Sequence, residues 1–186
     1  LKMPLLYMHK EGPSGRPVLF WLGENGKATA QDWPAVAKYL DAGYDIVSLD
    51  PRGMGETRMP YKAVSPDDPA LAKLDFDQAY TNSLSGVLAD YVYNSILTAR
   101  PYLFQMIEDI EIASRFLRSQ VNQHSELAIT GTNTASTLAG IVSQTLPNIK
   151  LLPQTDRQVL RWSELVDQKT ELWPIQYLLP GGAYVQ

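Results

Sequence analysis

The sequence has no cysteine and only two histidines among its 186 residues. The absence of cysteine excludes disulfide bonds and thiolate metal sites. The sequence also lacks a basic run, and its formal net charge is -4, so neither nucleic acid nor an anionic membrane is a favoured partner. No apolar stretch approaches the roughly 20 residues that a helix needs to span a bilayer. We therefore predict no membrane span. No His, Asp or Glu cluster has metal-ligand spacing, and we predict no metal and no cofactor.

The chain is long enough for one compact domain, because a domain of this size buries about 70% of the surface of its unfolded chain. We find no internal repeat and no domain boundary, and we predict a single domain over residues 1–186. The sequence starts at Leu1 rather than Met. We expect a processed form or part of a longer protein, truncated at its C-terminal end.

Apolar runs alternate with helical patterns along the chain. Four runs predict buried strands, at residues 17–23, 44–50, 126–131 and 149–152. Helical spacing predicts helices at about residues 32–43, 84–100, 103–117, 134–145 and 159–168. Residues 51–77 form a long loop that we expect to pack on the body or carry function. The alternation predicts an α/β fold, with a mostly parallel sheet and helices on both faces.

Two of these helices carry specific expectations about burial. In the first, Asp32 is expected to cap the N-terminus, and one face is expected to point to the core: Trp33, Val36, Ala37 and Leu40. In the helix after Pro101, the spacing predicts six inward residues: Leu103, Met106, Ile107, Ile110, Ala113 and Leu117.

Three motifs, taken in order, resemble the α/β-hydrolase fold. Leu22-Gly23 ends a strand where that family has its oxyanion loop. Asp50-Pro51-Arg52-Gly53-Met54-Gly55 resembles the D-x-R-G-x-G turn after the next strand. Gly131-Thr132-Asn133-Thr134-Ala135 occupies the place of the nucleophile elbow, G-x-S-x-G. The likeness covers residues 17–186.

The paired helices before the elbow, and Leu179-Pro180-Gly181, are most similar to the acetyl xylan esterase and related carbohydrate-esterase branch. The resemblance implies a small ester or carbohydrate ligand and favours export from a bacterial cell, although the compartment stays open. It also implies that the strands lie in the order second, first, third, fourth. Gly23, Glu24 and Asn25 would then lie beside Asn133 and Thr134 at the carboxyl edge of the sheet, where such folds bind ligands.

The elbow departs from the family pattern at its central position. Asn133 replaces the serine, and a carboxamide has no oxygen that a base activates as a nucleophile. The acid and histidine of the family follow later strands, before which this sequence stops. His9 precedes the first predicted strand, and His124 lies at the sheet end opposite the elbow. We therefore predict a degenerate nucleophile position at Asn133; the alternative is a plain asparagine that tolerates a strained turn.

Neighbouring hydroxyl and charged groups offer competing interpretations. A shifted nucleophile would be Thr132, Thr134 or Ser136, although an elbow points one side chain outward. Arg52 either orders the turn that contains Asp50, Gly53 and Gly55 or binds an anion, and we favour the structural role. The carboxylates of the loops are interpreted as turn residues rather than catalytic pairs: Asp50 with Glu56, and Asp67 with Asp68. Among the tryptophans, only Trp173 is kept as a ligand contact.

Three functions stay open on this evidence. The first is a catalytically deficient hydrolase of carbohydrate-esterase lineage, and the second is a non-catalytic binding or interaction module. The third is an active esterase with a shifted threonine or serine nucleophile. If the chain ends naturally here, the fourth strand would be an open sheet edge through which a homo-oligomer or another partner pairs.

Overall fold

The computed structural model describes residues 2–12, 15–59, 80–81, 86–120 and 126–152. The chain divides into two compact units. Of the described residues, 2–12, 15–57, 106–120 and 126–152 belong to the first unit, and 58–59, 80–81 and 86–105 belong to the second. The prediction of one domain stays a prediction. Several predictions fall outside the described residues: the helix at 159–168, most of the loop at 51–77 with Asp67 and Asp68, His124, Trp173 and Leu179-Pro180-Gly181.

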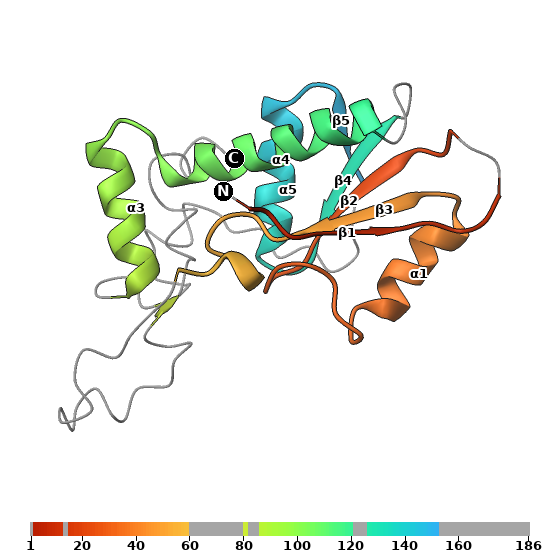
Figure 1. Ribbon diagram of the computed structural model, residues 1–186, viewed down its shortest axis with the longest axis horizontal. Helices are drawn as coiled ribbons and strands as arrows, with labels where there is room; N and C mark the ends of the chain where they lie inside the picture. Colours follow the sequence, from red (N-terminus) through yellow and green to blue (C-terminus); the bar gives the residue numbers. More distant parts are fainter. Residues whose placement is uncertain (1, 13–14, 60–79, 82–85, 121–125, 153–186) are drawn as a thin grey trace, which may run out of the picture. The chain divides into compact units, whose positions relative to one another are not determined.

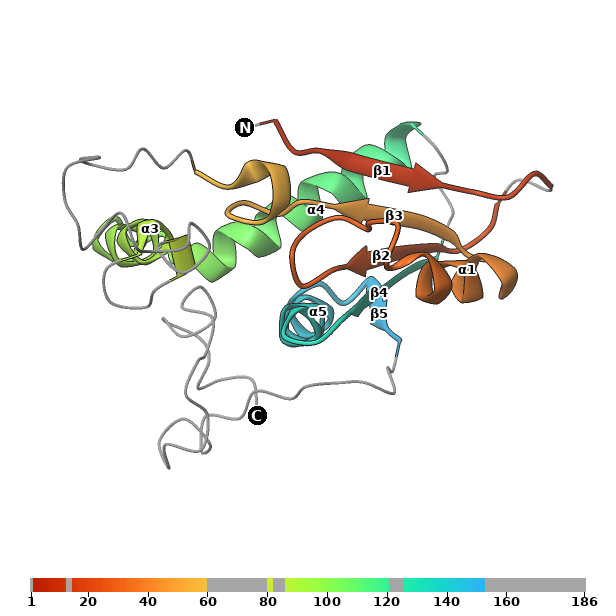
Figure 2. The same cartoon turned by 90° about the horizontal axis from the view of Figure 1, so that it is seen from below.

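The first unit is built on a five-stranded sheet (Figure 1). Its strands are β1 (Leu5–Met8), β2 (Val18–Leu22), β3 (Asp45–Leu49), β4 (Leu127–Gly131) and β5 (Ile149–Leu151). They lie in the order β1-β3-β2-β4-β5 (Figure 2). β2 is parallel to β3 and β4, and β4 is parallel to β5. The four predicted strands and their order are confirmed.

The sequence analysis missed β1, which pairs antiparallel with β3. β1 is half-exposed, whereas all five residues of β2 are buried. β1 lies at the edge of the described sheet, where a strand can fold without a continuous apolar sequence. The other strands were predicted from such sequences. The sheet is therefore mostly parallel with one antiparallel edge strand, which agrees with the predicted α/β class.

Helices bury the two faces of the central strands. On one face, Leu19 and Trp21 of β2 form a cluster with Val36 and Leu40 of α1 (Trp33–Asp41). Phe20 alternates to the other face and is also fully buried. α5 (Ala135–Thr145) packs against β4, β5 and β2, and eight of its eleven residues are buried.

Two expectations about α1 are wrong. The side chain of Trp33 is 53% exposed rather than in the core. Trp33 is the first helical residue, and a helical side chain lies over the preceding turn, which here leaves it beside Leu6 and Met8 in a surface groove. Asp32 precedes the helix, but its carboxylate accepts hydrogen bonds from the backbone N–H and hydroxyl of Thr29 instead of capping the helix.

The two helices before β4 are α3 (Val87–Leu97), in the second unit, and α4 (Tyr102–Gln120), which belongs to the first unit from Met106 onward. All six residues predicted to face inward from α4 are buried: Leu103, Met106, Ile107, Ile110, Ala113 and Leu117. Among the described residues, no helix has the length and apolar character needed to cross a membrane.

The pairing of β1 with β3 has a consequence for pH dependence. The hydroxyl of Tyr7 donates to Asp45 Oδ2 at 2.7 Å, and burial, with this hydrogen bond, raises the pKa of Tyr7 from 10.0 to about 12. The contribution of this group to stability is complete below pH 10 and is lost as the pH rises toward 12.

We expect the free energy of unfolding, measured in urea across this alkaline range, to fall more steeply in the wild type than in a Tyr7→Phe variant. Tyr39→Phe, which keeps the Tyr7–Asp45 bond, should behave as the wild type. Identical slopes for the wild type and Tyr7→Phe would contradict this role of Tyr7.

Candidate functional site

The turn between β4 and α5 is a tight strand–turn–helix connection. Asn133 lies in this turn with a φ of 46°, in the left-handed region that non-glycine residues rarely occupy. Asparagine tolerates this conformation better than most residues. Gly131 ends β4, and a Cβ at this position would overlap the backbone of Ala135 and Ser136. The connection therefore requires glycine at position 131, and Asn133 is exposed at the tip of the turn.

The loop after β2 lies directly against this turn. Leu22 and Gly131 are partners in the parallel pairing of β2 with β4, and the N–H of Thr132 extends the pairing by donating to the carbonyl of Leu22 at 2.9 Å. The N–H of Glu24 donates to Thr132 Oγ1 at 3.2 Å. The expected neighbourhood of the Gly23–Asn25 loop and Asn133 at the carboxyl edge of the sheet is thus present.

The carboxylate of Glu24 spans the elbow. Glu24 Oε2 accepts a hydrogen bond from Asn133 Nδ2 at 2.9 Å, and Oε1 accepts one from the Thr134 hydroxyl at 3.1 Å. The strand order predicted only that the backbone of Glu24 lies near Asn133. Nothing in the sequence indicated these two side-chain hydrogen bonds. Asn25 is exposed in the turn that the Gly26–Gly23 hydrogen bond closes, and its side chain takes no part in this network.

The hydroxyls of Thr132 and Ser136 form hydrogen bonds with the backbone of the turn and of the neighbouring loop. Thr132 Oγ1 accepts the Glu24 N–H, and Ser136, which is buried, donates to the carbonyl of Asn133 at 2.6 Å. His9 follows β1, and its ring stacks on Tyr7. Since Met8 pairs with Ile46 near the start of β3, His9 lies at the amino edge of the parallel strands, away from the elbow. Among the described residues, no histidine therefore stands beside Asn133.

The turn after β3 is organised around a buried carboxylate. Asp50 is fully buried and accepts hydrogen bonds from the Lys27 N–H at 2.5 Å, the Lys27 ammonium at 3.1 Å and the Glu56 N–H at 3.1 Å. A Cβ on Gly26 or Gly55 would overlap this carboxylate. The Lys27 ammonium also pairs with the Glu56 carboxylate, and this hydrogen bond, together with Asp50, raises the pKa of Lys27 above 10.5. This geometry supports a structural role for Asp50 and Gly55, and Gly53 has a φ of 78°, which favours glycine.

Arg52 ties the same turn to α4. Its Nε donates to Asp109 Oδ2 at 2.8 Å and its Nη2 to Asp109 Oδ1 at 2.6 Å, in a bidentate pair, and its backbone N–H donates to the same carboxylate. Asp109 is 2% exposed. The sequence predicted a structural role for Arg52 with a carboxylate or the backbone as partner, but the identity of Asp109 was not predictable from spacing.

Removing the negative charge of Asp109 should destabilise the first unit. In Asp109→Asn the guanidinium of Arg52 loses this bidentate carboxylate in a mostly buried place, and we expect the free energy of unfolding to fall by about 3 kcal/mol. Urea denaturation measures this loss. Asp41→Ala, which removes an exposed ion pair with Lys10, serves as control and should cost less than about 1 kcal/mol. Equal effects of the two changes would contradict the assigned role of the Arg52–Asp109 pair.

The left-handed backbone of residue 133 gives a second test. Both Asn133→Gly and Asn133→Ala remove the amide, but only alanine meets the left-handed penalty, so we expect the glycine variant to be more stable by about 1 kcal/mol. At Gln144, an exposed helical position of α5, the order should reverse, with alanine the more stable by about 1 kcal/mol. The same order at both positions, in thermal or urea unfolding, would show that residue 133 is not left-handed.

No protein-family model and no curated protein matches the sequence. Among solved structures, the chain is similar to an acetyl xylan esterase from Paenibacillus sp. R4, with a TM-score of 0.50 and 20% identity over 81% of this chain and 43% of that one. It is also similar to a candidate dienelactone hydrolase from Klebsiella pneumoniae, with a TM-score of 0.49 and 13% identity over 80% and 51% of the two chains. The chain thus spans about half, or less, of the length of these proteins. At such identity the likeness concerns the fold, and the fold of this chain is that of an α/β-hydrolase-like protein.

Proposed function

We propose that the chain is an α/β-hydrolase-like domain of carbohydrate-esterase lineage whose elbow binds a neutral carbohydrate or ester ligand without cleaving it. One observation carries the proposal: Asn133 occupies the left-handed tip of the strand–turn–helix connection, and the Glu24 carboxylate is hydrogen-bonded to its amide. In a hydrolase of this fold, a serine hydroxyl at this tip attacks the substrate. An amide has no hydroxyl that a general base can deprotonate, so it cannot act as the nucleophile in acyl transfer.

The polar groups at the tip suit a ligand with hydroxyl groups. Asn133 and Glu24 are both exposed, so a ligand can reach them. The Asn133 amide oxygen and the Glu24 carboxylate oxygens accept hydrogen bonds, and a carboxylate keeps acceptor capacity after its bonds to Asn133 and Thr134. Adjacent acceptors of this kind match the adjacent hydroxyl donors of a sugar ring. The carbohydrate-esterase lineage rests on the sequence motifs and on this chemistry together.

A shifted nucleophile is the second candidate, and one observation favours it. The Thr134 hydroxyl donates to the Glu24 carboxylate at 3.1 Å, which is within the range for proton transfer to a general base. Thr134 is also the residue that precedes the first turn of α5, a position where a threonine hydroxyl commonly serves local structure. The two candidates differ in one measurable respect, since only the shifted nucleophile produces ester turnover.

We expect the purified chain to bind xylobiose, seen as saturable shifts of the backbone amides of residues 24 and 132–134 in NMR spectra, and to hydrolyse p-nitrophenyl acetate no faster than buffer. Glu24→Ala should weaken xylobiose binding by about tenfold, because it removes a charged hydrogen-bond acceptor. Asp41→Ala, an exposed acidic position on α1, is the matched control and should leave binding unchanged.

Two outcomes would overturn the proposal. Ester turnover that disappears in Thr134→Ala, with the fold intact by circular dichroism, would establish the shifted nucleophile instead. The absence of any xylobiose response at the elbow would remove the carbohydrate assignment, even if the chain proves inactive as an esterase.

A further inference from the structure

A hollow lies at the opposite end of the sheet from Asn133, within the first unit. It encloses about 490 Å³ and is lined by residues that immediately precede four strands: Pro17 before β2, Tyr44 before β3, Glu126 before β4 and Asn148 before β5. Parallel strands begin at one edge of a sheet and end at the other. The hollow is therefore at the amino edge, and it is separate from the elbow and its Glu24 carboxylate.

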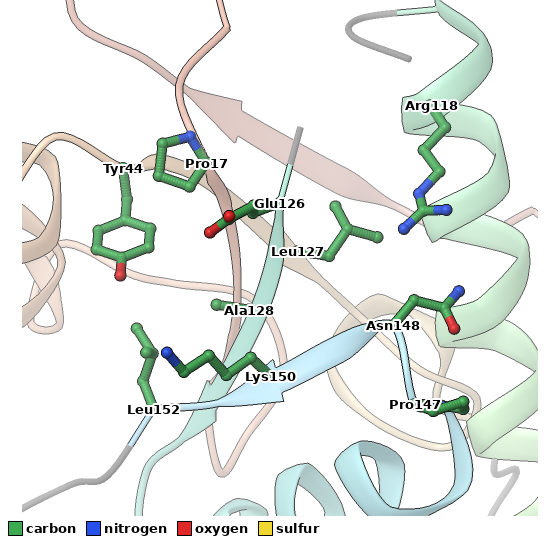
Figure 3. Close-up of a pocket in the computed structure, with 10 residues that line it drawn as sticks. All are labelled: Pro17, Tyr44, Arg118, Glu126, Leu127, Ala128, Pro147, Asn148, Lys150 and Leu152. Atoms are coloured by element: carbon green, nitrogen blue, oxygen red, sulfur yellow. The ribbon is translucent and has the colours of Figure 1, made fainter. Parts of the chain in front are cut away.

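The two ends of this hollow differ in character (Figure 3). At one end, the guanidinium of Arg118, on α4, points toward Asn148 and Leu127, with Pro147 nearby. At the other end lie Tyr44, Lys150 and Leu152. One end is cationic and amide-lined, and the other combines the Tyr44 ring and Leu152 with the Lys150 ammonium. The apolar groups between and beside the charges suit a ligand with one anionic head and an apolar body.

In the part of the chain that the structure describes, the charged groups that line the hollow have no partner of opposite charge within ion-pair distance. Among the described residues, none of the side chains of Arg118, Lys150 and Glu126 takes part in an ion pair or a hydrogen bond. In addition, Arg118 Nε is buried and has no hydrogen-bond acceptor. A guanidinium whose charge is partly removed from water and left without an acceptor is unfavourable, and a bound anion on its exposed nitrogens would offset this cost.

We propose that this hollow binds a small monocarboxylate with an apolar body. The carboxylate would accept hydrogen bonds from the Arg118 guanidinium and the Asn148 amide, and the apolar body would lie along Leu127 toward Tyr44. Arginine favours this class of ligand, because its planar nitrogens match the two oxygens of a carboxylate. The Glu126 carboxylate, which lines the same hollow, disfavours ligands of higher negative charge, such as a phosphate dianion.

The test uses the full chain, with sodium benzoate as probe, benzyl alcohol as its uncharged counterpart and inorganic phosphate as an anion without an apolar body. We expect benzoate to cause saturable NMR shifts at the amides of Leu127, Asn148 and Lys150. Benzyl alcohol, which has no carboxylate, and phosphate, which has no apolar body, should each bind at least about tenfold more weakly than benzoate.

Variants on α4 separate the site from general charge effects. Arg118→Gln should weaken benzoate binding by about tenfold, and Arg118→Lys should have an intermediate effect because it keeps the charge but loses the two-pronged geometry. Arg115→Gln, an exposed arginine of the same helix that pairs with Glu111, should leave binding unchanged. Circular dichroism establishes that each variant is folded, and if Arg118→Gln is not, Arg118→Lys decides alone.

The proposal is overturned if benzoate produces no saturable shifts, if phosphate binds as tightly as benzoate, or if a folded Arg118 variant binds benzoate as the wild type does. It does not depend on the elbow, and Glu24→Ala should leave benzoate binding unchanged. Loss of benzoate binding in Glu24→Ala would mean that the probe occupies the elbow instead, which also overturns the assignment.

Discussion

The parallel pairing of β2 with β4 is the constraint on which the arrangement of the carboxyl edge depends. The pairing continues past the strands through the hydrogen bond from the Thr132 N–H to the Leu22 carbonyl. The loop after β2 and the turn after β4 therefore begin side by side at the carboxyl edge of the sheet. Gly131 lets the backbone of α5 approach closely, and the short turn that follows has the left-handed residue Asn133 at its tip. The side chains of Glu24 and Asn133 meet as a result of these two backbone facts.

Much of the fold was predictable, because buried parallel strands leave a strong pattern. β2 is a continuous apolar run, and β4 is apolar except for the buried Thr130 and the final glycine, as expected for strands buried on both faces. The inward face of α4 followed from helical spacing alone. β1 was missed because an edge strand needs only partial burial. Trp33 was placed wrongly because the side chain of the first helical residue lies over the preceding turn, here in a surface groove beside β1.

The candidate site was predictable in position but not in chemistry. The order strand, turn, helix located Asn133 at the tip, and the strand order located Glu24 nearby. The bonds of the Glu24 carboxylate to Asn133 and Thr134 depend on side-chain rotamers, which leave no trace in the sequence. The partner of Arg52 was likewise hidden, because Asp109 is 57 residues away along the chain and looks like any other polar residue of an amphipathic helix.

The carboxylate of Glu24 also changes the electrostatic potential at the elbow. Hydrolases of this fold direct backbone N–H dipoles at this place and favour negative charge on the reacting oxygen. Here a fixed negative charge lies over the same place, bonded to the amide that replaces the nucleophile. An acid, such as the one released when an ester is cleaved, would be repelled from this position, whereas an uncharged polyol would not. The Glu24 carboxylate therefore makes the carboxyl edge of this sheet less favourable for an acid than for a neutral molecule.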